Sequence, residues 1–163
     1  MPAVQIRPLP ESLKALANKF YRAHRSPMRT HHEDRVWVIQ TNEIAAALCL
    51  RPVATGQWLT GLFVAPERRR QGLARQLVEQ ALQHSAEPVW LFCHPQLDAF
   101  YLRLGFQACT QLPDELGGRL ARYQRSKPLI ALVRAASHLP SADAGAIPPQ
   151  PACAPNHQTD RIR

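Results

Sequence analysis

The chain has 163 residues, 45% of them hydrophobic, which suits one globular domain with a substantial core. Its 20 Lys and Arg residues against 12 Asp and Glu give a formal charge of +8, which favours acidic partners such as nucleic acid, anionic lipid or a phosphorylated cofactor. No apolar run approaches the length of a membrane span, so we expect no membrane association.

The first half of the chain predicts a strand and a helix, followed by three more strands. Residues 4–8 alternate as a strand, and a helix opens at Pro10. We expect one face of this helix to carry five apolar residues at helical spacing: Leu13, Leu16, Ala17, Phe20 and Tyr21. A polar loop over 24–34 then leads to three apolar strands, predicted at 35–40, 44–50 and 58–64.

The second half of the chain alternates helices with strands. An amphipathic helix over 72–85 precedes a buried strand over 88–93, and Gly105 ends a short helix over 96–104. The remaining elements are a strand, a helix weakened by two glycines and a last strand, predicted at 106–109, 112–125 and 129–133. This order predicts an α/β fold of the α+β type, in which helices cover both faces of a mixed sheet.

The composition changes near Ala136. From there to the last residue the sequence is rich in Pro and Ala and has no hydrophobic period, which predicts a disordered tail over 136–163. The charges of the tail cancel, so the whole excess of positive charge belongs to residues 1–135, which we predict to be the functional domain.

The four cysteines show no Cys-x-x-Cys spacing, which favours neither a zinc ribbon nor a redox motif. Three of them lie in apolar runs and are expected to be small core residues: Cys49, Cys93 and Cys109. The first residues lack the basic and apolar stretches of a secretory signal, so we expect a cytoplasmic protein.

A group of arginines lies between the predicted strand that ends at Val64 and the amphipathic helix that follows. The spacing Arg69-x-x-Gly72-x-Ala74 lets the backbone approach a ligand closely, and the helix start presents free N–H groups and a positive dipole end. Four basic side chains surround this turn: Arg68, Arg69, Arg70 and Arg75. The segment therefore predicts a phosphate or pyrophosphate site, without the spacing of a P-loop or of a dinucleotide fingerprint.

Together with a second motif, this segment resembles the GNAT superfamily of N-acetyltransferases. The first motif fits the family's [Arg/Gln]-x-x-Gly-x-[Gly/Ala] loop, and Tyr101-Leu-Arg-Leu-Gly-Phe106 fits its Tyr-x-x-x-Gly-Phe signature. The predicted element order also matches, from about Val4 to Val133. The resemblance implies a mostly antiparallel mixed sheet whose strands splay apart at the cofactor site.

The resemblance implies acetyl-CoA as co-substrate and gives each motif a role. The backbone of three strand residues would bind the pantetheine arm: Leu62, Phe63 and Val64. The pyrophosphate would lie on the loop and helix start, formed by Arg69, Arg70, Gln71, Gly72, Leu73, Ala74 and Arg75. Tyr101 would give a proton to the leaving thiolate of CoA.

The sequence departs from the family pattern at the expected base. His94 stands where members often have Asn, and the strand at 58–64 contains no carboxylate, Thr60 being its only polar side chain. His94 is one candidate for the base because imidazole titrates near neutrality. The alternative is a loop cluster that could also select substrate or be only a charged surface: His31, His32, Glu33 and Asp34. We expect no metal there, because adjacent ligands seldom complete a tetrahedral site.

Three functions follow from these patterns. The first is an N-acetyltransferase that acetylates a primary amine of a small molecule or a peptide. The second is an acyl-CoA-binding regulatory module without turnover, which the missing carboxylate favours. The third is a nucleic-acid-associated protein, which the sequence disfavours because it has no basic stripe interleaved with aromatic residues. The resemblance is also compatible with a homodimer.

Overall fold

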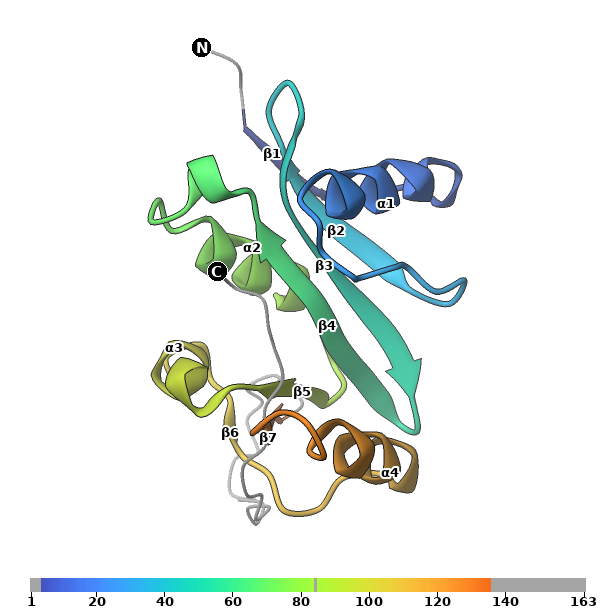
Figure 1. Ribbon diagram of the computed structural model, residues 1–163, viewed down its shortest axis with the longest axis vertical. Coiled ribbons are helices and arrows are strands. Elements are labelled where there is room, and N and C mark those ends of the chain that lie inside the picture. The colour runs from blue at the N-terminus through green and yellow to red at the C-terminus, as the bar shows by residue number, and fades with distance from the viewer. Residues whose placement is uncertain (1–3, 84, 136–163) are drawn as a thin grey trace. The chain divides into compact units, whose positions relative to one another are not determined.

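The computed structural model describes residues 4–83 and 85–135 and contains strands and helices in the predicted order (Figure 1). The elements are β1 Gln5–Pro8, α1 Lys14–Ala23, β2 Arg35–Gln40, β3 Ile44–Val53, β4 Gly56–Val64, α2 Leu73–Leu82, β5 Val89–Cys93, α3 Asp98–Leu102, β6 Gln107–Ala108, α4 Asp114–Tyr123 and β7 Ile130–Arg134. Short 3-10 turns precede three of the helices, at Glu11–Leu13, Pro66–Arg68 and Pro95–Leu97.

The seven strands form one mixed sheet in the order β1-β2-β3-β4-β5-β7-β6. The pairs β1/β2, β2/β3, β5/β7 and β6/β7 are antiparallel, whereas β4 and β5 are parallel. The α+β fold class predicted from the sequence is therefore confirmed. The register of β4 with β5 pairs Gln57 with Val89 and Trp58 with Trp90. That these strands splay apart beyond this point stays a prediction.

The described chain divides into two compact units. The first comprises residues 4–52 and 59–83, and the second comprises 53–58 and 85–135. No helix among the described residues is long and apolar enough to cross a membrane. The predicted tail over 136–163 lies outside the described residues.

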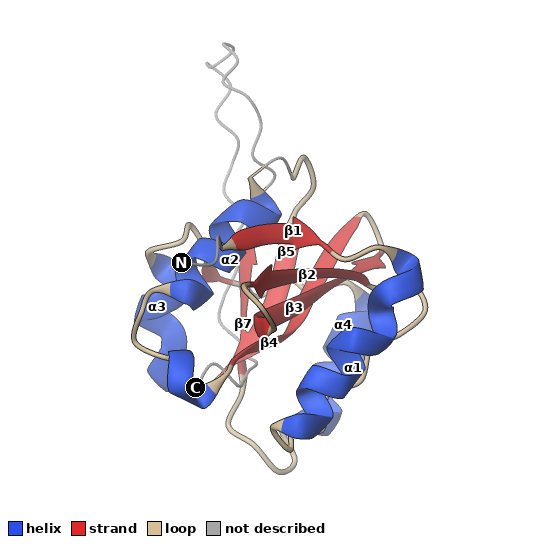
Figure 2. Cartoon of the chain, turned by 90° about the horizontal axis from the view of Figure 1, so that it is seen from above, coloured by secondary structure: helices blue, strands red, loops and turns tan. Residues whose placement is uncertain are grey.

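In the first unit, α1 and α2 lie on opposite faces of the strands (Figure 2). The α1 side holds a buried cluster to which the helix contributes Ala17, Phe20 and Tyr21, and the strands contribute residues such as Val38, Cys49 and Phe63. Helix α2 packs against β1 and β2 through an apolar face formed by Leu73, Leu77, Val78 and Leu82. The sheet is thus covered on both faces in this unit, as predicted.

In the second unit, α4 covers a core that contains Trp58 and Phe92, whose rings lie 5.5 Å apart. Two buried leucines of α4, Leu116 and Leu120, join this core. The helix forms despite Gly117 and Gly118 because burial of an amphipathic face outweighs a weak intrinsic preference.

The prediction for the first helix was wrong at its start. Leu13 and Leu16 were expected on the buried face, yet they are 36% and 40% exposed. The α-helix begins only at Lys14, and its buried residues are Ala17, Phe20 and Tyr21. The three cysteines expected in the core are buried, free thiols, which confirms that interpretation.

Candidate functional site

The backbone between β4 and α2 carries two left-handed residues. Beyond the 3-10 turn Pro66–Arg68, Arg70 has φ +66° and Gly72 has φ +78°. Left-handed backbone is costly for a residue with a side chain, and strain of this kind concentrates at binding sites. Left-handed residues also occur in the turns whose successive N–H groups form anion-binding concavities.

The N–H groups of this segment are available to a ligand. Among the described residues, none of the hydrogen bonds uses the N–H groups of residues 70–75, and the first helical bond runs from the N–H of Gln76 to the carbonyl of Gly72. These groups lie at the start of α2, where the helix dipole favours negative charge. The exposed residues Arg70, Gln71, Gly72 and Arg75 leave the segment open to solvent.

The arginines of the loop are not equivalent. Arg69 folds back onto β4: its Nε donates to the carbonyl of Val64 at 2.8 Å, and its guanidinium lies 5.1 Å from the centroid of the Phe63 ring. The N–H of Arg69 also donates to Pro66, at 3.4 Å. Arg69 therefore holds the loop against β4, and Arg70 is the more solvent-exposed of the two cations.

The two other arginines have local partners. Arg68 donates to the side chain of Gln71 at 3.4 Å, and Arg75 pairs with Glu79 at 3.3 Å one turn along α2. Both partners of the Arg75 pair are more than half exposed, so water weakens the attraction. The pair leaves Arg75 free to turn toward a phosphate at small cost.

The strand residues predicted to hold pantetheine are Leu62, Phe63 and Val64, and all three are buried. Phe63 packs edge-on against Phe20 of α1, with ring centroids 5.8 Å apart. These side chains belong to the core, and the role of the backbone of this segment in binding pantetheine stays a prediction.

The second unit holds the two predicted catalytic residues. His94 is half-buried at the end of β5, where its carbonyl accepts a hydrogen bond from Leu97. Tyr101 is 2% exposed in α3, between the rings of Phe100 and Phe106 at 4.9 and 5.7 Å. Gly105 has φ +94° and closes this helix, as predicted. The catalytic roles of His94 and Tyr101 stay predictions.

In the second candidate cluster, at the loop before β2, Asp34 is buried whereas the other three residues are at least partly exposed. The expectation of a uniformly exposed charged loop is wrong for Asp34, which is 3% exposed and accepts hydrogen bonds from Arg51 at 2.8 and 3.3 Å and from the N–H of His31 at 2.7 Å. Asp34 is a structural anchor because a buried carboxylate needs such partners. It is therefore unsuited to be a base.

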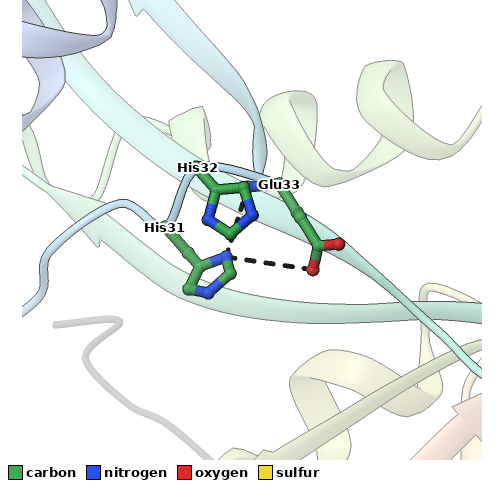
Figure 3. A group of neighbouring side chains, drawn as sticks. All are labelled: His31, His32 and Glu33. Carbon is green, nitrogen blue, oxygen red and sulfur yellow. Dashed lines mark hydrogen bonds and ion pairs between the residues drawn. The ribbon is translucent and has the colours of Figure 1, made fainter.

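The remaining three residues of this cluster lie together on the loop (Figure 3). The ligand atoms of His31, His32 and Glu33 all lie within 4.8 Å of one another. Nδ1 of His31 already accepts the N–H of Glu33 at 3.2 Å. A metal at that nitrogen would have to displace this bond, and the prediction that the protein uses no metal stays a prediction.

Sequence analysis missed a buried polar contact in the first unit. The hydroxyl of Tyr21 in α1 donates to the carbonyl of Gly61 in β4 at 2.7 Å, and Gly61 has φ +69°. A glycine inside an otherwise apolar strand is a known signal of a bulge or of a close approach, and it could have drawn attention to this position.

Comparison with known proteins agrees with this architecture. The family model of the acetyltransferase (GNAT) domain matches residues 32–108, from the loop before β2 to the end of β6. This match identifies residues 32–108 of the chain as an acetyltransferase (GNAT) domain. A comparison with curated proteins gave no match.

Solved structures share the fold at low sequence identity. The ribosomal-protein-S18-alanine N-acetyltransferase of Escherichia coli is 18% identical, with a TM-score of 0.63 over 89% of this chain and 100% of its own. An acyl-CoA N-acyltransferase of Pseudomonas aeruginosa is 21% identical, with a TM-score of 0.58 over 82% and 100%. N-acetylglutamate synthase of Neisseria gonorrhoeae, solved with coenzyme A and N-acetyl-glutamate, is 14% identical, with a TM-score of 0.60 over 85% and 36%.

Proposed function

We propose that this protein is an acetyl-CoA-dependent N-acetyltransferase that acetylates a primary amine of a small molecule or a peptide. The observation that carries the proposal is the set of N–H groups at residues 70–75, which have no partner among the described residues and surround two left-handed residues at a helix start. Such a backbone suits a pyrophosphate. The CoA-bound solved structure with the same fold supports this choice of anion.

The first unit would bind the co-substrate. N–H groups between Arg70 and Arg75 would hold the pyrophosphate, with the guanidinium of Arg70 as its closest free cation. Arg69 would act indirectly, because its side chain is already bonded to Val64. The backbone of residues 62–64 would bind the pantetheine arm and orient the thioester.

The second unit would complete the reaction. Acetyl transfer requires a neutral amine to attack the thioester carbon, after which the carbon–sulfur bond breaks and the thiolate takes a proton. Tyr101 would supply that proton from its hydroxyl. His94 would remove a proton from the amine, as an imidazole at the end of a strand can do near neutral pH.

Two measurements on the full chain test the proposal. Acetyl-CoA should raise the melting temperature, because a ligand of the native state stabilises it. Release of free thiol from acetyl-CoA, screened against amines and peptides, should depend on the acceptor. No thermal shift at millimolar acetyl-CoA would contradict the cofactor assignment.

The second candidate function is an acyl-CoA-binding module without turnover. The sequence of β4 favours it, because Gly56–Val64 contains no carboxylate that could serve as a base. This alternative predicts the same thermal shift with acetyl-CoA, but no thiol release with any acceptor. The thiol assay therefore separates the two functions.

We further infer that residues 1–135 form the acetyltransferase domain and that the protein acts in the cytoplasm. The described elements end with β7 at Arg134, and the described cysteines are free thiols, which suits a reducing compartment. Removal of residues 136–163 should leave the melting temperature and the thiol release unchanged.

A homodimer, which the resemblance allows, can be tested by light scattering of the full chain.

A further inference from the structure

The hydroxyl of Tyr21 is buried against the strand that carries the proposed pantetheine site. Tyr21 has no exposed surface, and its hydroxyl oxygen lies 2.7 Å from the carbonyl oxygen of Gly61. The two residues are 40 positions apart in sequence, so the bond joins α1 directly to β4. Leu62, the first proposed pantetheine residue, follows Gly61 along the chain.

The direction of this contact is fixed by the proton count of the hydroxyl. Tyr21 has one O–H, which it donates to Gly61, so its contact with the sulfur of Cys49 at 3.8 Å must use the thiol as the donor. Burial raises the pKa of Cys49 to about 12 and raises the pKa of Tyr21 well above its ordinary value. Both groups therefore keep their protons at neutral pH, and the hydroxyl of Tyr21 remains a donor to the carbonyl of Gly61.

The conformation of Gly61 restricts which residue can stand at this position. Its φ of +69° is left-handed, a conformation that strains a residue with a side chain. A buried carbonyl without a hydrogen bond is costly, and the hydroxyl of Tyr21 donates one to the carbonyl of Gly61. A Cβ built at this position would lie 2.9 to 3.0 Å from atoms of the Met28 side chain, and the left-handed backbone would strain any side chain there.

We propose that Tyr21 is a positioning residue that holds the Gly61 segment of β4 in the shape that receives the pantetheine arm of acetyl-CoA. This role rests on the proposed function. Tyr21, in α1, donates a hydrogen bond to the carbonyl of Gly61. The side chain of Met28, in the loop that follows α1, lies next to the Cα of Gly61. Among the described residues, neither side chain forms a hydrogen bond with the proposed pyrophosphate loop at residues 70–75. Substitutions of Tyr21 or Met28 should therefore affect binding of the pantetheine arm and not of the pyrophosphate.

The test compares two ligands on three forms of the full chain. The ligands are acetyl-CoA and 3′-phospho-ADP, which is CoA without its pantetheine arm. The proteins are the wild type, Tyr21→Phe and Tyr123→Phe, the last being the same chemical change at an exposed tyrosine of α4. Calorimetric titration gives each Kd, and circular dichroism confirms that each variant is folded.

The expected result is selective. Tyr21→Phe leaves a carbonyl without its donor, so its Kd for acetyl-CoA should rise about tenfold, whereas its Kd for 3′-phospho-ADP should stay within about twofold of the wild type. Tyr123→Phe should change neither value. If Tyr21→Phe does not fold, Met28→Ala provides the same comparison, with an expected rise of about threefold for acetyl-CoA alone.

Two results would overturn this role. Wild-type affinity of Tyr21→Phe for acetyl-CoA would show that the bond does not shape the site, and equal loss of both ligands would show a general structural effect. A wild-type chain that binds neither ligand would instead refute the proposed function, and the role of Tyr21 with it.

Discussion

The loop at residues 69–75 and the segment around Tyr101 carry the two halves of the family resemblance, yet their physical surroundings differ. The loop is exposed, positively charged and built from backbone N–H groups around left-handed residues. Tyr101 is buried between aromatic rings and would act through one side-chain hydroxyl. We therefore expect changes in the loop to alter affinity for acetyl-CoA, and a change at Tyr101 to alter turnover.

The largest effect is expected at Tyr101. Tyr101→Phe removes one hydroxyl and keeps the ring in place, so kcat should fall about 100-fold while KM for acetyl-CoA changes less than about twofold. Steady-state thiol release with a fixed acceptor measures both constants. A rise in KM at unchanged kcat would assign Tyr101 to binding and remove the contrast between the two regions.

Gly72 should be the most sensitive position of the loop. Gly72→Ala places a Cβ on a residue with φ +78°, which costs about 1–2 kcal/mol and would move the neighbouring N–H groups, so affinity for acetyl-CoA should fall about tenfold. A matched control is Gly118→Ala in α4, where a Cβ meets no atom within 4 Å. This control should leave affinity unchanged and stabilise the fold by about 0.5–1 kcal/mol. Equal affinity of the two variants would contradict the proposed role of the loop.

The dependence on salt concentration should distinguish the roles of the loop and of Tyr101 in the wild-type protein. Raising the ionic strength from about 0.05 to 0.5 M screens the exposed arginines of the loop, so the Kd for acetyl-CoA should rise several-fold. Proton transfer from buried Tyr101 should be far less sensitive, so kcat at saturating acetyl-CoA should remain nearly constant. A kcat that falls in parallel with affinity would show that the two regions do not act independently.

The smallest effect is expected at Arg75. Its side chain is 66% exposed and already pairs with Glu79, so Arg75→Ala should weaken acetyl-CoA binding by only about twofold. Arg70→Ala, which removes the more open cation, should cost more. Calorimetry on both variants gives the comparison, and a larger loss at Arg75 would reverse the assignment of the closest phosphate ligand.

Local patterns in the sequence were sufficient to predict the order of strands and helices and the loop at Gly72 that precedes the amphipathic helix. Hydrophobic periodicity and the position of one glycine are properties of neighbouring residues, so no distant contact is needed to read them. The resemblance to the GNAT family rested on two short motifs, one at Gly72 and one at Tyr101.

Contacts between distant segments could not be predicted in this way. The bond from Tyr21 to Gly61 and the ion pair from Arg51 to Asp34 join residues that only the folded sheet brings together. Periodicity identified Tyr21 as apolar core, although its hydroxyl has a specific partner. Asp34 looked like one more charge of a polar loop because its burial depends on Arg51 in β3. Leu16 was expected to be buried because spacing alone does not show how far a core extends along a helix.

Hydrogen–deuterium exchange of the full chain, with and without acetyl-CoA, tests the central claim most directly. Without ligand, the N–H groups of residues 70–75 should exchange rapidly, because no described residue accepts a hydrogen bond from them. Saturating acetyl-CoA should slow their exchange and that of residues 61–64, while peptides from α4 remain unchanged. Rapid exchange at residues 70–75 in the presence of saturating acetyl-CoA would contradict the account.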